Sequence, residues 1–325
     1  MKQKVTIIGT GSFGTALASI LADNKIEVLM FGVVAKEVND INNFNRNLNY
    51  FNDIKLNKLI KATLSFQEAI NFSDYVFICV PSFAIKSIVY QINNFGTKKY
   101  NFIHTSKGMV LNYNLSASEM FSKFINSNFL NSNSGIYGPS FANEIILKKP
   151  VFFSICSKHN FVLNQLKKMF ENNYVKIKKE KNILVHEYFA ILKNPLAILS
   201  GFILNQTNSK NFESIIISKG INEIKLIIKY LLNQNKINIS SILIADAILT
   251  TTSLKSRNFN FGYNLKLDKN ILNLNPKVTV EGINTLNSIQ KRIGLDFKKF
   301  KLFYFLYQLF FLKKEINQEY INLLS

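Results

Sequence analysis

Tryptophan is absent from the 325 residues, and only two cysteines and three histidines are present. Cys79 and Cys156 stand alone inside apolar runs, with neither a CxxC spacing nor a neighbouring histidine. This pattern suggests neither a disulfide framework nor a zinc site, and buried free thiols fit a reducing cytoplasm. The histidines lie far apart without an acidic residue at ligand spacing, so we expect no metal ion.

Long apolar runs are also missing. The longest one, Leu302 to Leu312, contains Gln308 and is too short to cross a membrane, since a spanning helix needs about 20 residues. A strand-like run begins at Lys4, which leaves no room for a signal peptide. We therefore expect a cytoplasmic protein without stable membrane insertion.

Acidic residues are half as numerous as basic ones. The 40 Lys and Arg against 20 Asp and Glu give a formal net charge of +20, which raises the hypothesis of binding to nucleic acid or an anionic membrane. The lysines are scattered rather than clustered, however, and the abundance of Lys, Asn, Ile and Phe is typical of AT-biased coding. We therefore expect no nucleic-acid partner. The length and the 47% hydrophobic content suffice for the cores of two domains.

The most informative stretch, Lys4 to Ala22, joins a β-branched run to a glycine-rich turn and then to an apolar helical pattern. Gly9, Gly11 and Gly14 form GxGxxG, in which the glycines permit a tight turn, close approach of a pyrophosphate, and close packing of helix on strand. The N–H groups and dipole at the start of the helix favour a bound anion. The sequence thus predicts a dinucleotide-binding Rossmann-like domain.

The residues after the next predicted strand, Glu27 to Phe31, bear on the choice of cofactor. An Asp or Glu at that strand's end would hydrogen-bond the 2′-hydroxyl of NAD. Gly32, Val33 and Val34 stand there instead, and Lys36 is close enough in sequence to meet a 2′-phosphate. This pattern favours NADPH, the alternative being that Lys36 is an ordinary solvated charge.

Three loops follow apolar, strand-like runs, and they begin at Pro81, Ser106 and Gly138. In an open α/β sheet, ligands bind beyond the carboxyl ends of the strands. One contains Lys107, which is placed to meet a cofactor or an anionic substrate. Another begins at the turn of Gly138, where Ser140 offers a hydroxyl and Ala142 keeps the loop narrow. These loops are therefore candidate ligand-binding segments.

From about Val185 the pattern changes, because apolar residues recur at helical spacing and strand alternation is absent. We predict an α/β domain over residues 1–183 and an all-helical substrate-binding domain over residues 184–325.

The predicted helical domain has three polar constellations in apolar surroundings. Lys193 is flanked by core-type residues, and a buried lysine needs an anionic or hydrogen-bonding partner; the alternative is a lysine at a helix end. Asp246 is the same case with the opposite charge. Ser256, Arg257 and Asn258 combine a hydroxyl, a guanidinium fork and an amide, which suits a phosphate.

Together these motifs resemble the bacterial-type NAD(P)-dependent glycerol-3-phosphate dehydrogenases. The similarity covers nearly the whole chain in one order: GTGSFG at 9–14, YVFICVPS at 75–82, SKG at 106–108, GPSFANE at 138–144, LKNPLAI at 192–198, SKGINEI at 218–224, SRN at 256–258 and EG at 281–282.

The resemblance implies reduction of dihydroxyacetone phosphate to sn-glycerol 3-phosphate, a phospholipid precursor, by NAD(P)H. It also implies a C-terminal domain like that of 6-phosphogluconate dehydrogenase, and Lys193 as the proton donor. The implied cofactor contacts are Gly9, Gly11, Ser12, Phe13, Gly14, Lys107, Ala142, Arg257 and Glu281. The implied substrate contacts are Lys107, Gly138, Ser140, Lys193, Asp246, Ser256, Arg257 and Asn258. The sequence leaves the oligomeric state open, with a homodimer as one alternative.

The chain departs from this family at two stretches of the predicted helical domain, and it also lacks the basic residue often found after the second strand. Asn211 is followed by Phe212-Glu213-Ser214 where a glycine-rich loop and an Asn-Ala-basic-Ala pattern are usual, and Ser240 to Ala245 replaces another glycine-rich stretch. Residues other than glycine disfavour a positive φ, so we expect the loop over the substrate to take another path. Two alternatives stay open: a dehydrogenase of another phosphorylated ketone or short keto acid, and a cofactor-binding protein that has lost catalysis.

Overall fold

The computed structural model describes residues 3–265, 280–312, 314, 321 and 324. The chain forms two compact units. Unit 1 contains residues 1–106 and 117–183, and unit 2 contains residues 107–116 and 184–325.

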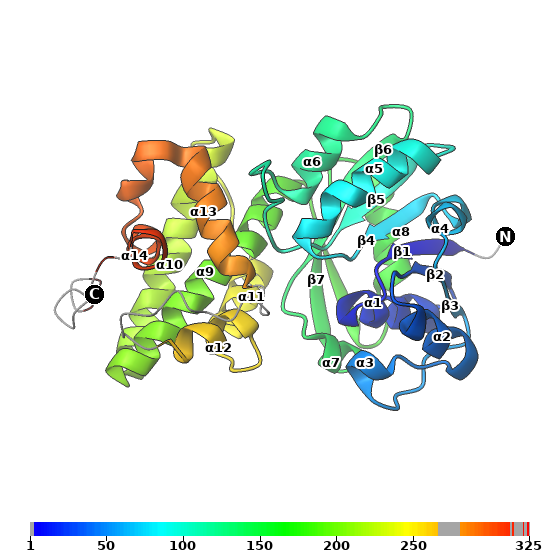
Figure 1. Ribbon diagram of the computed structural model, residues 1–325, viewed down its shortest axis with the longest axis horizontal. Coiled ribbons are helices and arrows are strands. Elements are labelled where there is room, and N and C mark those ends of the chain that lie inside the picture. The colour runs from blue at the N-terminus through cyan, green and yellow to red at the C-terminus, as the bar shows by residue number, and fades with distance from the viewer. Residues whose placement is uncertain (1–2, 266–279, 313, 315–320, 322–323, 325) are drawn as a thin grey trace. The chain divides into compact units, whose positions relative to one another are not determined.

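Unit 1 is built on an eight-stranded sheet of order β3-β2-β1-β4-β5-β6-β7-β8 (Figure 1). Neighbouring strands are parallel except β6 and β7, which pair antiparallel. The strands are β1 (Lys4–Ile8), β2 (Glu27–Phe31), β3 (Ile60–Thr63), β4 (Tyr75–Ile78), β5 (Tyr100–His104), β6 (Leu130–Tyr137), β7 (Val151–Ser157) and β8 (Val175–Glu180). The strand order reverses between β1 and β4, and in such sheets the ligand binds at this switch point. The predicted Rossmann-like α/β domain is confirmed.

Helices connect these strands and pack against the sheet. They are α1 (Ser12–Asp23), α2 (Ala35–Phe44), α3 (Leu48–Phe51), α4 (Phe66–Phe72), η1 (Ser82–Ala84), α5 (Ile85–Phe95), α6 (Ala117–Phe124), α7 (Ala142–Ile146) and α8 (Asn160–Phe170). Buried apolar side chains of β1, β2, α1 and α8 form one core, in which the Phe77 and Phe170 rings lie 5.5 Å apart. This core holds the carboxyl ends of the central strands rigidly, so the loops that follow them start from fixed points.

Both cysteines of unit 1 are free thiols. Burial raises the pKa of Cys79, at the end of β4, to about 12, although a hydrogen bond involving Thr105 acts in the opposite direction. A thiol held in its neutral form is a poor nucleophile and a poor metal ligand.

Helices make up the described part of unit 2 after residue 183, whereas residues 107–116 form turns and a bridge between Val110 and Leu115. Its helices are α9 (Ile183–Thr207), α10 (Lys210–Leu232), α11 (Ser241–Thr251), α12 (Arg257–Tyr263), α13 (Glu281–Ile293), η2 (Gly294–Lys299) and α14 (Lys301–Phe311). Among the described helices, α9 alone is long and apolar enough to cross a membrane by length and composition, and 94% of its most apolar window is buried within the protein. Burial of that extent is typical of a core helix.

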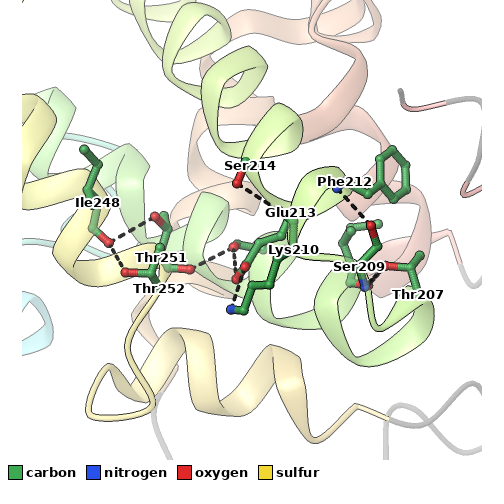
Figure 2. Close-up of polar contacts among 11 residues, drawn as sticks. Thr207, Ser209, Lys210, Phe212, Glu213, Ser214, Ile248, Thr251 and Thr252 are labelled. Atoms are coloured by element: carbon green, nitrogen blue, oxygen red, sulfur yellow. Dashed lines mark hydrogen bonds and ion pairs between the residues drawn. The ribbon is translucent and has the colours of Figure 1, made fainter.

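Helices occupy the places where the sequence departs from glycine-rich loops. Ser209 accepts a hydrogen bond from the backbone N–H of Phe212 at 3.2 Å and so caps α10, and Ser240 caps α11 in the same way at 3.4 Å. Figure 2 shows Glu213 of α10 close to Lys210 and Thr251. These serine caps stabilise helices in the two segments where the sequence lacks the glycine-rich loops.

A polar network joins the three central helices of unit 2. The buried Glu213 carboxylate accepts a hydrogen bond from Lys210 Nζ at 2.7 Å, and Ser200 Oγ of α9 lies 3.4 Å from its other oxygen. The same Ser200 hydroxyl donates to the backbone carbonyl of Thr251 at 2.8 Å. This network fixes the carboxyl end of α11 at Thr251 (Figure 2). The same helix contains Asp246 and Thr250.

Candidate functional site

The glycine turn after β1 has the geometry that a dinucleotide needs. Gly9 has φ +118°, and a Cβ there would lie 2.5 Å from the Cys79 carbonyl oxygen at the end of β4. Gly11 faces open space, since nothing lies within 4 Å of where its Cβ would be. It is also the N-cap of α1 and makes no side-chain cap hydrogen bond, since glycine has no side-chain acceptor. A pyrophosphate would supply that acceptor, so these residues fit a dinucleotide.

The loop after β6 lies at the same edge of the sheet, because β1, β4, β5 and β6 run parallel. Gly138 has φ +148°, a conformation that other residues rarely adopt. The Ser140 hydroxyl donates to the Gly138 carbonyl at 2.8 Å, which closes the turn, and Ala142 begins α7. The Ser140 hydroxyl thus holds the shape of the loop.

A buried ion pair lies in unit 2. Lys193 of α9 donates a short hydrogen bond from Nζ to the Asp246 carboxylate of α11, and both side chains are buried. Lys193 Nζ also donates to Thr250 Oγ1 at 2.8 Å, and that hydroxyl donates in turn to the Asp246 backbone carbonyl at 2.7 Å. Asp246 and Thr250 stand four residues apart on one helix face. The predicted buried lysine therefore has its anionic partner, together with a threonine that the sequence analysis did not identify.

Burial is the main cause of a lowered pKa at Lys193. It lowers the pKa of Lys193 from 10.5 to about 7, because the charged ammonium loses its hydration. The Asp246 carboxylate raises this pKa, whereas the positive charge of Lys107 lowers it further. Lys193 can therefore give up or accept a proton near neutral pH, which is what a general acid–base group requires.

Asn194 connects this pair to the segment of residues 107–116. Its amide Nδ2 donates to the backbone carbonyl of Lys107 at 2.8 Å. At the other end of that segment, the buried Ser116 hydroxyl donates to the Glu187 carboxylate of α9 at 2.7 Å. The segment is therefore attached to α9 at both ends, and Lys107 lies near Lys193 as its effect on the lysine pKa requires.

The predicted phosphate-binding residues begin α12. Ser256 accepts a hydrogen bond from the backbone N–H of Phe259 at 3.4 Å and caps the helix. Arg257 is exposed and makes no ion pair with any residue that the structure describes. Asn258 Oδ1 accepts from the Gly282 N–H of α13 at 3.2 Å.

Glycine is required at position 282 because helices approach closely there. A Cβ on Gly282 would lie 3.0 Å from the Asn194 backbone carbonyl oxygen. This approach brings the starts of α12 and α13, with Asn258 and Glu281, against the part of α9 that contains Lys193. Within unit 2 the structure thus gathers Lys107, Lys193, Asp246 and Asn258, while the predicted glycine-loop residues, Gly138, Ser140 and Ala142 belong to unit 1.

Metal ligands are not grouped in the described residues. No cluster of three or more His, Cys, Asp or Glu side chains that could hold a metal ion occurs among them. Histidine 104 is buried, and burial lowers its pKa to about 4, with its Nε2 bonded to Asn133 at 2.9 Å.

A Rossmann-like domain followed by a helical domain with a buried lysine–carboxylate pair defines a class, the dehydrogenases that use a nicotinamide dinucleotide. Comparison with known proteins makes the assignment narrower. Residues 4–162 match the N-terminus, and residues 182–320 the C-terminus, of the NAD-dependent glycerol-3-phosphate dehydrogenases, so the chain belongs to that family.

Individual relatives agree with this assignment. Proteins named glycerol-3-phosphate dehydrogenase [NAD(P)+] from Staphylococcus epidermidis and Mesoplasma florum are both 33% identical to the chain. The first similarity covers 88% of this chain and 87% of the relative, and the second 91% and 90%. The solved glycerol-3-phosphate dehydrogenase of Coxiella burnetii has the same fold, with a TM-score of 0.85 and 20% identity over 99% of this chain and 98% of that one.

Proposed function

We propose that this protein reduces dihydroxyacetone phosphate to sn-glycerol 3-phosphate, reversibly, with NADH or NADPH. Membership of the family and the names of the relatives support this activity. The observation that carries the chemistry is Lys193, which is buried against Asp246 and Thr250 with a pKa lowered to about 7. The product is the backbone precursor of glycerophospholipids.

In this proposal Lys193 is the general acid. A bound nicotinamide cofactor would supply the hydride for this reduction. Lys193 holds the proton that the carbonyl oxygen receives as the ketone becomes an alcohol. In the oxidative direction the neutral amine takes the hydroxyl proton. Asp246 and Thr250 hold Nζ in place by hydrogen bonds from one face of α11, which limits the reorganisation needed when the proton moves. Lys107 makes Lys193 a stronger acid by charge repulsion.

The substrate phosphate is assigned to the start of α12. Arg257 offers a planar fork of N–H donors that matches phosphate oxygens, and the Asn258 amide nitrogen is a further donor. Lys107, Gly138, Ser140 and Ser256 complete the proposed substrate contacts. The proposed cofactor contacts are Gly9, Gly11, Ser12, Phe13, Gly14, Lys107, Ala142, Arg257 and Glu281. A cytoplasmic protein, with a homodimer as the proposed assembly and without nucleic acid or stable membrane insertion, completes the proposal.

The activity is tested by cofactor oxidation. Purified protein should oxidise NADH or NADPH when dihydroxyacetone phosphate is added, and not with unphosphorylated dihydroxyacetone at the same concentration. Equal rates with the two ketones would remove the role assigned to Arg257 and Asn258. Oxidation with a short keto acid but not with dihydroxyacetone phosphate would favour the alternative dehydrogenase.

The pH dependence of kcat follows from the lowered pKa of Lys193. Reduction needs the protonated lysine, so its kcat should be full below about pH 7 and fall about tenfold per pH unit well above it. Oxidation needs the neutral amine and should show the opposite trend. Because Asp246 raises this pKa, Asp246→Asn should move both transitions to lower pH. A reductive kcat that stays flat up to about pH 9 would assign the proton to another group.

A further inference from the structure

The buried side chain of Glu37 is hydrogen-bonded to the glycine turn that follows β1. Glu37 lies in the first turn of α2 and is 5% exposed. It accepts a hydrogen bond from Thr10 Oγ1 at 2.5 Å and from Asn49 Nδ2 at 3.1 Å. Thr10 is the residue between the first two glycines of the GxGxxG motif, so this carboxylate is coupled directly to the turn.

Thr10 also lies beside Gly32, the residue that directly follows β2. A Cβ built on Gly32 would lie 2.6 Å from Thr10 Oγ1. In dinucleotide-binding domains the side chain at the end of this strand contacts the adenosine ribose. Glu37 and the missing side chain of Gly32 therefore flank one hydroxyl group. The α2 carboxylate, which binds Thr10 Oγ1, therefore lies near the place where β2 provides no acidic side chain.

Glu37 makes no ion pair with any residue that the structure describes. Its hydrogen-bond partners are the neutral side chains of Thr10, Asn49 and Tyr50, and burial together with the Glu37 charge raises the pKa of Tyr50. Lys36 is exposed, and water screens a charge in that position strongly. A buried charge is screened less, so the Glu37 carboxylate acts more strongly than Lys36 on a group bound at the end of β2.

We infer that Glu37 selects the cofactor, and that the protein prefers the dinucleotide with a free 2′-hydroxyl, NADH, over the 2′-phosphorylated NADPH. This inference rests on the proposed function, because it concerns the cofactor of that reaction. It opposes the preference that residues 32–36 indicate by themselves. A 2′-phosphate adds a dianion beside a carboxylate that cannot move into water, whereas a hydroxyl adds no charge.

Calorimetric titration of the full-length protein with NADH and with NADPH, without ketone, tests the inference. The parent protein should bind NADPH at least about tenfold more weakly than NADH. Glu37→Gln keeps the size of the side chain and removes its charge, so it should reduce the ratio of the two Kd values by about tenfold, chiefly through tighter binding of NADPH. Glu171→Gln is the matched control, since Glu171 is paired with Lys167 on α8, and it should leave the ratio unchanged.

Thermal melts show whether each variant is folded. Glu37→Leu fills the buried position with an apolar side chain, so it should also reduce the ratio of the Kd for NADPH to the Kd for NADH. Equal binding of the two nucleotides by the parent protein, or tighter binding of NADPH, would overturn the inference. A ratio that Glu37→Gln and Glu37→Leu both leave unchanged would also overturn it. Binding of neither nucleotide would instead contradict the proposed function itself, and the inference with it.

Discussion

Replacement of Lys193 by methionine should lower kcat for reduction of dihydroxyacetone phosphate by about 10²–10⁴, because the carbonyl oxygen loses its proton donor. Methionine matches the length of the side chain and has no titratable proton. The Kd of NADH should change little, since the Lys193 contacts within unit 2 are with Asp246 and Thr250. Steady-state kinetics at saturating substrate, combined with a titration of the cofactor, separate these two effects.

The same substitution has a cost in stability. Lys193 and Asp246 are buried together, so removal of the lysine leaves a buried carboxylate without its cation. Breaking such a pair typically costs about 3–5 kcal/mol. The free energy of unfolding of the variant should therefore be measured alongside kcat. An enzyme that is folded and keeps the parental kcat would contradict the role of Lys193.

Replacement of Arg257 by alanine should lower kcat/KM for dihydroxyacetone phosphate by about ten- to a hundredfold, which corresponds to about 1.5–3 kcal/mol for one charge-assisted hydrogen bond. Part of this loss should fall on kcat, because a loosely held substrate is also poorly aligned. Arg257 is exposed, so the melting temperature should stay near that of the parent.

Arg257→Lys is the matched variant, because it keeps the positive charge and loses the planar fork. It should fall between the parent and Arg257→Ala. Full retention of kcat/KM by Arg257→Ala would show that the phosphate binds elsewhere, and parental kcat/KM in Arg257→Lys would show that the fork contributes nothing beyond its charge.

Local features of the fold were predictable from the sequence, because they depend on neighbouring residues. The strand–turn–helix around Gly9, the later strands and the change to helices near Val185 all follow from short-range patterns. The antiparallel pairing of β6 with β7 was not predicted, since it depends on which strand edges are free to pair. Helices at residues 210–214 and 241–245 could be anticipated only as a departure from a glycine-rich loop.

Some residues of the candidate site could likewise be predicted from the sequence, and others could not. Lys193 and Asp246 stood out as single charges in apolar helices, but their pairing joins residues that are far apart in the chain. Thr250 had one usable signal, its spacing of four residues from Asp246. Glu37 had none, because a sequence motif looks for the ribose-binding carboxylate at the end of the strand and this one comes from the next helix. Three-dimensional contacts were needed to find both residues.

The most direct test of the proton-transfer claim is kcat for dihydroxyacetone phosphate reduction in the double variant Lys193→Met/Asp246→Asn. This variant removes both buried charges at once, so it avoids the stranded carboxylate that complicates the single substitution. We predict a folded protein that binds NADH like the parent and has a kcat at least about 100-fold lower. A folded double variant with a kcat close to that of the parent would contradict the account.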